Sequence, residues 1–264
     1  MNSTKRILLF VLLVGFSVRT FAQSKVFGSP NLLKYDKRLF HFGIMLGGSS
    51  LNYFVKSNPD LTDYDYKIVE TKGGLAFNIG IVTDLRMGKY FDLRLIPAIA
   101  VGDPVICYYK ANYDVPVKPT TQHVYLDVPL LVKFKSSRMA NNIRAYVIGG
   151  AQYSLDMTSN AKYNKEHGGQ YNKSFPVLKR SSQEDEIYLL TKFHDFLGVA
   201  GVGFDFYCTY FKFAVELKMS FGIPNLLIGP GDPRYASYDD LSRQYVSSID
   251  YLKSRNFQIS ITFE

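Results

Sequence analysis

The amino-acid sequence predicts an all-β fold: an eight-stranded antiparallel transmembrane β-barrel with short periplasmic turns and long extracellular loops. Three observations predict this fold. Apolar and polar residues alternate along eight segments, which is the pattern of strands with one apolar face. Short and long connections between these segments alternate strictly, as they do in bacterial outer-membrane barrels. After the N-terminal leader, no apolar run approaches the roughly 18 residues that a membrane-spanning helix needs.

The leader has the features of a cleavable secretory signal peptide. Basic residues precede an apolar run from Ile7 to Val18, and small residues mark a cleavage site after Ala22. Export without a helical span leaves a closed barrel as the structure that satisfies its backbone groups in lipid. We therefore divide the chain into a signal peptide (1–22), a periplasmic N-terminal segment (23–38) and an outer-membrane β-barrel (39–264).

The strand boundaries follow from the alternation. We expect strands over about 39–54, 72–85, 90–110, 122–135, 143–157, 192–207, 211–221 and 255–264. The short connections are then 86–89, 136–142 and 208–210, and the long ones are 55–71, 111–121, 158–191 and 222–254. Pro97 and Pro129 fall inside strands, and because proline lacks an N–H they predict bulges or local breaks.

The last expected strand has a strict apolar face. Its apolar residues are Phe257, Ile259, Ile261 and Phe263, and polar residues lie between them. We expect this strand to close the sheet against the first strand. Its apolar face, with an aromatic residue near the end, also resembles the signal that the barrel insertion machinery reads in outer-membrane proteins. In that pattern the aromatic residue is often the last one, whereas here Glu264 follows it.

The polar faces of the strands predict a charged interior. An eight-stranded barrel has room inside for little more than its own side chains. The inward-facing charged residues are expected to be Asp92, Arg94, Asp127, Lys133, Glu216 and Lys218. Opposite charges in so narrow a lumen should pair, because an unpaired buried charge is costly. The sequence favours a salt-bridged structural plug, and a conducting or proton-linked lumen is the alternative.

Composition and motifs favour neither nucleic-acid binding nor catalysis. The formal charge of +8 falls to +5 when the three basic residues of the leader are removed, a modest excess for an exported chain. No GxSxG or HExxH motif and no metal-ligand spacing of Cys or His occurs. We expect no catalytic residue, cofactor or metal; a lipid-modifying enzyme using His123 is the remaining enzymatic alternative. Cys107 and Cys208 are expected at opposite ends of the barrel and therefore unpaired.

Residues 30–54 carry a resemblance to a known family. The stretch PNLLKYDKRLFHFGIMLGGSSLNYF runs an Asn-Leu-x-x-Tyr-Asp segment directly into the first strand. It resembles the PorT/SprT family of outer-membrane barrels of Bacteroidota. The resemblance implies an accessory or assembly component of the type IX secretion system, which exports cargo bearing a C-terminal sorting domain. It implies no catalytic residue. The implied partners are other outer-membrane or periplasmic secretion-system proteins. The barrel layout itself predicts contact with membrane lipid and the insertion machinery, and it predicts that both termini are periplasmic.

The long loops support an alternative function. The polar, tyrosine-bearing loop 158–191 is typical of a surface that binds an outside partner, as in a small structural or adhesive barrel. Residues 239–252 place Leu241, Tyr245, Ile249 and Leu252 at helical spacing, which predicts a short amphipathic helix over the barrel mouth.

Overall fold

The structure is a computed structural model that describes residues 30–57, 66–102, 105–110, 118–119, 123–139, 142–157, 177–179, 186–188, 191–228 and 249–264. The predicted signal peptide and residues 23–29 lie outside these ranges. The strands of the main sheet are β1 (Phe40–Ser57), β3 (Gly74–Arg86), β4 (Phe91–Leu95), β5 (Ala98–Gly102), β8 (His123–Lys135), β9 (Ile143–Asp156), β12 (His194–Tyr207), β13 (Lys212–Gly222) and β14 (Ile249–Phe263).

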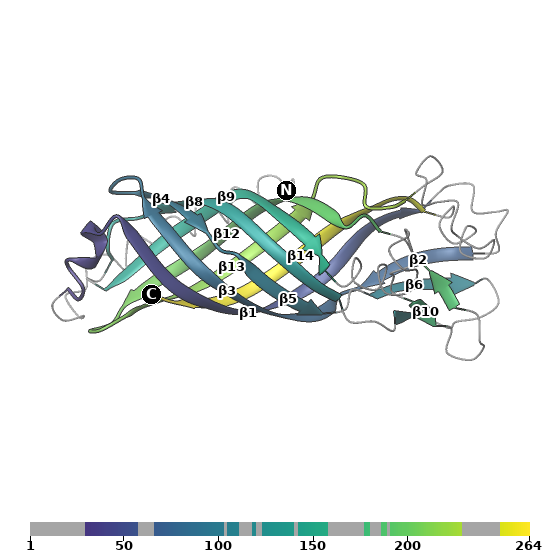
Figure 1. Cartoon of the computed structure of the whole chain (residues 1–264), viewed down its shortest axis with the longest axis horizontal. Helices are drawn as coiled ribbons and strands as arrows, with labels where there is room; N and C mark the ends of the chain where they lie inside the picture. The colour runs from purple at the N-terminus through teal and green to yellow at the C-terminus, as the bar shows by residue number, and fades with distance from the viewer. Residues whose placement is uncertain are drawn as a thin grey trace, which may run out of the picture.

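The main sheet closes on itself, so the predicted eight-stranded barrel is confirmed. Its order is β1-β14-β13-β12-β9-β8-β4-β3-β5, and further pairings join β1 to β3 and β5 to β8. Every pairing is antiparallel. β4 and β5 lie end to end between β3 and β8 and together take the place of one strand. The nine strands therefore form an eight-stranded barrel. β14 closes the sheet against β1, with Ile44 opposite Phe263, as the sequence predicts (Figure 1).

Pro97 interrupts the strand pairing with β8 between β4 and β5, and the register is the same on both sides of the interruption. The ladder to β8 stops at Leu95, which faces Leu130, and resumes at Ala98, which faces Asp127. Two residues therefore separate the halves on each strand, so the interruption is a local break and not a bulge. Pro129 lies opposite this break and leaves β8 continuous. Both prolines thus lie at one point of the sheet, and each still accepts a hydrogen bond through its carbonyl, Pro97 from Ile81 and Pro129 from Ile96.

The two faces of the barrel wall differ sharply, as the alternation predicts. On β3, Leu75, Phe77, Ile79 and Ile81 are exposed on the outside, whereas Ala76, Asn78 and Val82 are buried inside. β13 and β14 repeat the pattern, with outward Phe221 and Phe263 and fully buried Glu216 and Ser260. Exposed apolar side chains recur on the outward faces of β1, β3, β8, β13 and β14, and we call them the outer belt; so many are unusual for a soluble monomer.

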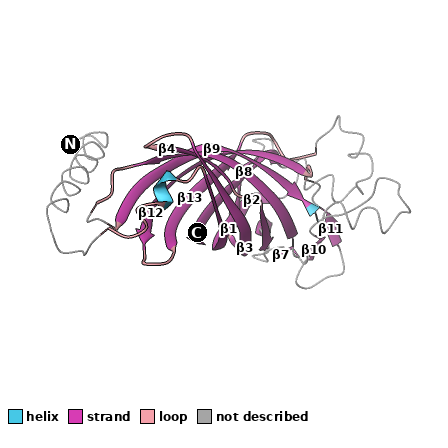
Figure 2. Ribbon diagram, turned by 60° about the vertical axis from the view of Figure 1, so that its left-hand side comes forward, coloured by secondary structure: helices cyan, strands magenta, loops and turns pink. Residues whose placement is uncertain are grey.

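The two ends of the barrel are different. We call the end with the tight β3–β4, β8–β9 and β12–β13 connections the turn end, and the opposite end the loop end. A 3-10 turn, η2 (Tyr35–Lys37), lies at the turn end together with the last residues of β14. Figure 2 shows the strands curving around the interior, with η2 beside one end of the wall.

Strand pairing continues beyond the barrel wall at the loop end. β2 (Tyr66–Lys72) pairs with β6 (Val105–Lys110), and β7 (Lys118–Pro119), β10 (Val177–Lys179) and β11 (Glu186–Tyr188) form a small sheet. β1 alone has 18 residues, and such a strand is about 60 Å long, about twice the hydrocarbon thickness of a bilayer. The walls therefore extend well past a membrane.

Two expectations about the segments between strands were wrong. The predicted strand over 90–110 is divided into β4, β5 and β6. The helix predicted over 239–252 does not reach its last turn, because Ile249 to Leu252 begin β14 and pair with β1. The register shifts between Lys56 and Ser57, which leaves Ile249 and Leu252 both buried although they are three residues apart; this spacing resembles that of a helix. The rest of that predicted helix lies outside the described residues.

Candidate functional site

The lumen of the turn half is filled by a network of paired charges centred on Arg94 of β4. Arg94 Nη2 lies 2.7 Å from Asp84 Oδ2 and 3.1 Å from Glu264 Oε1, and its Nη1 lies 2.9 Å from Glu216 Oε2. All four side chains are essentially inaccessible to solvent. The planar guanidinium has enough donors to satisfy three carboxylates at once. Lys218 approaches the second oxygen of Glu216 at 3.0 Å.

Lysines of neighbouring strands complete this network. Lys133 Nζ donates to Asp205 Oδ1 at 2.9 Å, and Lys212 Nζ lies 2.7 Å from Glu264 Oε2. Lys135 of β8 pairs with Asp92 of β4. The lumen network consists of the carboxylates Asp84, Asp92, Asp205, Glu216 and Glu264 and the cations Arg94, Lys133, Lys135, Lys212 and Lys218. Five negative charges thus meet five positive charges, as a buried network requires.

Apolar and aromatic side chains fill the space that the charges leave. Tyr146 lies under Lys133, whose Nζ is 3.8 Å from the ring centroid, and the Tyr146 hydroxyl donates to Glu216. This arrangement gives the ammonium group a cation–π contact in addition to its carboxylate. Buried clusters of Leu131, Tyr146, Ile148, Val199 and Ala214, and of Met45, Val82, Ile96 and Ala98, pack beside the network.

The residues that precede β1 fold back onto the turn end. The backbone N–H of Asn31 donates to Asn142 Oδ1, and the Asn31 side chain donates to the carbonyl of Tyr207. Arg138 Nη1 returns a hydrogen bond to the Asn31 carbonyl at 2.6 Å. Leu32 adopts a φ of 50°, a left-handed conformation that turns the chain toward the barrel. Residues 31–38, which we call the docking segment, are therefore held against the barrel end.

Asp36 and Tyr35 anchor the docking segment to the barrel. Asp36 Oδ2 lies 3.0 Å from both Arg138 and Arg144, and its Oδ1 accepts from the hydroxyl of Tyr207. Partial burial raises the pKa of Asp36, but the two guanidinium groups and this hydroxyl outweigh it and hold the pKa below its usual 3.8. Tyr35 donates its hydroxyl to Glu264 Oε2 at 2.8 Å, and burial strongly raises its pKa.

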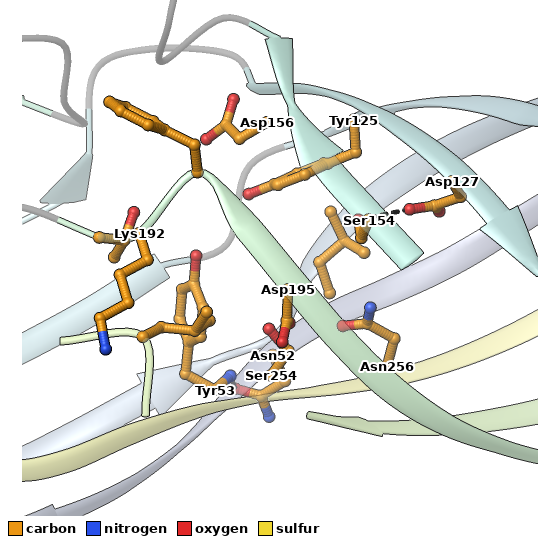
Figure 3. A pocket seen from close by; sticks show the side chains of 14 residues that line it. Asn52, Tyr53, Tyr125, Asp127, Ser154, Asp156, Lys192, Asp195, Ser254 and Asn256 are labelled. Atoms are coloured by element: carbon orange, nitrogen blue, oxygen red, sulfur yellow. Dashed lines mark hydrogen bonds between the residues drawn. The ribbon is translucent and has the colours of Figure 1, made fainter. Parts of the chain in front are cut away.

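A cleft lies at the opposite end of the lumen (Figure 3). Its cavity volume is about 40 Å³, which is room for a small polar group. Its walls come from β1, β8, β9, β12 and β14 and from the residues just before β12. The lining residues are Leu51, Asn52, Tyr53, Tyr125, Asp127, Ser154, Asp156, Thr191, Lys192, Phe193, Asp195, Leu226, Ser254 and Asn256.

The structure brings five of the six predicted lumen charges into the network and places Asp127 elsewhere. Asp92, Arg94, Lys133, Glu216 and Lys218 belong to the network. Asp127 lines the cleft, where it accepts a hydrogen bond from Ser154 Oγ at 2.5 Å. Asp127 follows the same alternation as Lys133, but it stands six residues further toward the loop end of β8.

Asp127 is the acidic residue closest to His123 in the sequence, but His123 contacts a different carboxylate. His123 Nδ1 lies 2.8 Å from Asp156 Oδ2, across the β8–β9 pair. This resembles the acid–base half of a catalytic triad, but the nearby Ser154 hydroxyl donates to Asp127 instead. Within the described residues, no group of His, Cys, Asp and Glu is arranged to hold a metal ion. Cys208 is a free thiol.

Several network residues escaped sequence reasoning. Asp84 lies on the inward face of β3, so the alternation of apolar and polar residues could have predicted its position in the lumen. Asp205 lies on β12, where inward Leu197 and Val199 are as apolar as the outward side chains, and the face could not be assigned. Glu264 and the docking segment contact residues that are far away in the sequence. Asp36, for example, lies 102 residues from Arg138.

The apolar face of β14 lies on the outside of the barrel. Phe257, Ile259, Ile261 and Phe263 are each about half exposed, whereas Ser260 and Thr262 between them are fully buried. Phe263 also lies near Phe211, with ring centroids 6.4 Å apart. No described helix is both long and apolar enough to cross a membrane.

Comparison with known proteins adds two findings. The family model described as "Outer membrane protein beta-barrel domain" matches residues 21–227. The solved structures that match include the crystal structure of the outer membrane protein OprG from Pseudomonas aeruginosa, with 13% sequence identity and a TM-score of 0.39, over 84% of this chain and 91% of that chain. No curated protein matches the sequence.

Proposed function

We propose a function from the premise that the chain belongs to the outer membrane protein beta-barrel domain family. It is an outer-membrane β-barrel protein of a Gram-negative bacterium. Within that class, it acts as a non-enzymatic accessory or assembly component of type IX protein secretion in a Bacteroidota-type cell. It is needed for the export of cargo that carries the C-terminal sorting domain.

The resemblance of residues 30–54 to the PorT/SprT family carries the secretion role, and the filled lumen limits the form that this role can take. Arg94, Lys133 and Glu216 are fully buried in the middle of the barrel, so a folded cargo protein has no path through it. A barrel of this kind contributes to secretion from beside a translocation pore, as a scaffold or assembly factor. Its outer belt contacts membrane lipid.

The docking segment supports the resemblance to the PorT/SprT family. Asn31, Tyr35 and Asp36 come from the Asn-Leu-x-x-Tyr-Asp stretch that carries the resemblance, and each makes a specific contact at the turn end. That stretch therefore holds the chain against the turn end of this barrel. The alternation of apolar and polar residues that makes a barrel strand does not by itself require these residues. The contacts give a physical reason for its side chains, and the secretion role itself rests on the resemblance.

We place the turn end in the periplasm and the loop end outside the cell, as for bacterial barrels in general. The docking segment then faces the periplasm. It presents exposed Leu33, Lys34, Lys37 and Arg38, an apolar and basic surface suited to an acidic periplasmic or outer-membrane partner of the secretion system. The apolar face of β14 would serve the insertion machinery.

A clean in-frame deletion in the native host tests the secretion role. We expect unprocessed cargo bearing the sorting domain to accumulate in the periplasm, and complementation with the full chain to restore its surface delivery. An outer-membrane protein without that domain is the control, and its level should not change. Normal cargo delivery in the deletion strain would overturn the role and leave a structural or adhesive barrel, in which trimming loop 158–191 should abolish binding to an outside partner.

A further inference from the structure

The cleft at the loop end holds more negative than positive charge. Asp127, Asp156 and Asp195 line it from three different strands, whereas Lys192 is the one cation among its lining residues. The Lys192 side chain is exposed, and Figure 3 shows its ammonium group at the edge of the cleft, away from Asp195. Lys218 of the lumen network lies close enough to attract Asp127, but its ammonium group is paired with Glu216 at 3.0 Å.

Asp195 is the side chain that points to a ligand. It is 8% exposed, and Ser254 and the backbone N–H of Phe196 donate hydrogen bonds to its carboxylate. Its other oxygen, Oδ1, is buried and accepts no hydrogen bond from the described residues. A buried carboxylate oxygen without a donor is costly, and Asp127 lies close enough to repel it. A donor that carries positive charge would relieve both penalties.

The rest of the lining defines the kind of cation. The carboxylates are not arranged as a metal site in the described part of the chain. Tyr53, Tyr125 and Phe193 add aromatic surface, and the Tyr53 and Tyr125 hydroxyls share a hydrogen bond that fixes both rings. Aromatic faces beside carboxylates are typical of sites for organic cations.

We propose that this cleft binds a small aliphatic amine, whose ammonium group donates hydrogen bonds to Oδ1 of Asp195 and to the carboxylate of Asp127. The hydrocarbon part of the amine lies against Tyr53 and Tyr125. Asp156 is already engaged by His123 and adds negative potential at the mouth. The cleft lies at the loop end of the lumen, so we expect its ligand to arrive from that side. This proposal does not rest on the role in secretion.

Titration calorimetry with the folded full chain in detergent tests the site. The probe is 1,4-diaminobutane at low ionic strength, and 1,4-butanediol is the uncharged control of the same carbon skeleton. We expect the diamine to bind and the diol not to bind. Equal heats from the two compounds, or no heat from the diamine, would overturn the proposal. This outcome does not depend on whether a variant folds.

Matched variants locate the binding. Asp195→Asn keeps the shape and removes the charge, and since a charge-assisted hydrogen bond is lost we expect about tenfold weaker binding or more. Asp127→Asn should act in the same direction. Asp250→Asn is the control, because Asp250 is an exposed aspartate outside the cleft on β14, and its loss should leave the affinity unchanged. Equal weakening by Asp250→Asn and Asp195→Asn would show diffuse attraction and not a site.

Discussion

At the scale of single residues, Arg94 joins parts of the chain that are far apart in sequence. Its three carboxylate partners come from β3, from β13 and from the residue after β14. A lysine cannot replace it, because one ammonium group lacks the planar fork that reaches several carboxylates. The network therefore fixes how strands on opposite sides of the lumen face each other.

We expect Arg94→Ala to destabilise the barrel strongly. The substitution leaves Asp84, Glu216 and Glu264 without their shared cation, and removing one partner of a buried ion pair typically costs about 3–5 kcal/mol. Urea unfolding of the detergent-folded protein, followed by tyrosine fluorescence, measures the free energy of unfolding.

Lys56→Ala is the matched control for this prediction. Lys56 pairs with Asp250 at 2.9 Å, as close as pairs in the lumen, but both side chains are about half exposed. Exposed pairs contribute little, because water screens the two charges. Equal losses from the two variants would mean that burial of the network is not what makes it stabilising.

At the scale of elements, the docking segment depends on the ionisation of Asp36. The pKa of Asp36 is lowered from 3.8 in the folded chain, so its contribution to docking is complete above pH 3.8 and is lost as the pH falls through the lower folded value. The amides of residues 31–38 should therefore be protected from hydrogen exchange at neutral pH, and their protection, taken relative to the intrinsic exchange rate at each pH, should fall in strong acid.

Asp36→Asn should remove that pH dependence. We expect faster exchange of the docking segment at neutral pH in this variant, because Arg138 and Arg144 lose their charged partner. Lys37→Ala, which changes an exposed side chain of the same turn, should exchange like the unaltered chain. Protection that survives Asp36→Asn would show that Asn31 and Tyr35 suffice for docking.

The outward face of β14 gives a separate prediction about assembly. If this face acts as an insertion signal, Phe263→Ser should reduce the amount of folded barrel in the outer membrane several-fold. Phe221 of β13 is the matched control, since it is also 46% exposed on the outside. Membrane fractionation and heat-modifiable migration measure the folded amount. Similar losses from Phe263→Ser and Phe221→Ser would show that only general lipid contact matters.

The elements differ in how much the sequence could predict. β13 and β14 alternate strongly, so the inward positions of Glu216 and Lys218 and the outward position of Phe263 follow from periodicity alone. β12 carries apolar residues on both faces, and Asp205 was missed there. The docking segment and the contacts of Glu264 could not be predicted, because they depend on closure of the barrel and not on local pattern. The cleft likewise forms only when five strands meet.

At the scale of the whole molecule, the lumen has two unlike halves. The turn half is filled by balanced charges and covered by the docking segment, whereas the loop half opens into the cleft lined by Asp127 and Asp195. Such a barrel can present surfaces at both ends without joining them. Accessory work in secretion and ligand binding at the loop end are therefore compatible.

This division predicts that the barrel does not conduct. Arg94, Lys133 and Leu131 are fully buried in the lumen, so side chains occupy the turn half and we expect no continuous water path through it. We expect no steady current steps from the purified chain in planar bilayers at neutral pH. A variant lacking residues 31–38 should also be silent, because the lumen network, and not the docking segment, fills the interior. Current steps in that variant alone would make the docking segment the plug, and steps in the unaltered chain would contradict a closed lumen.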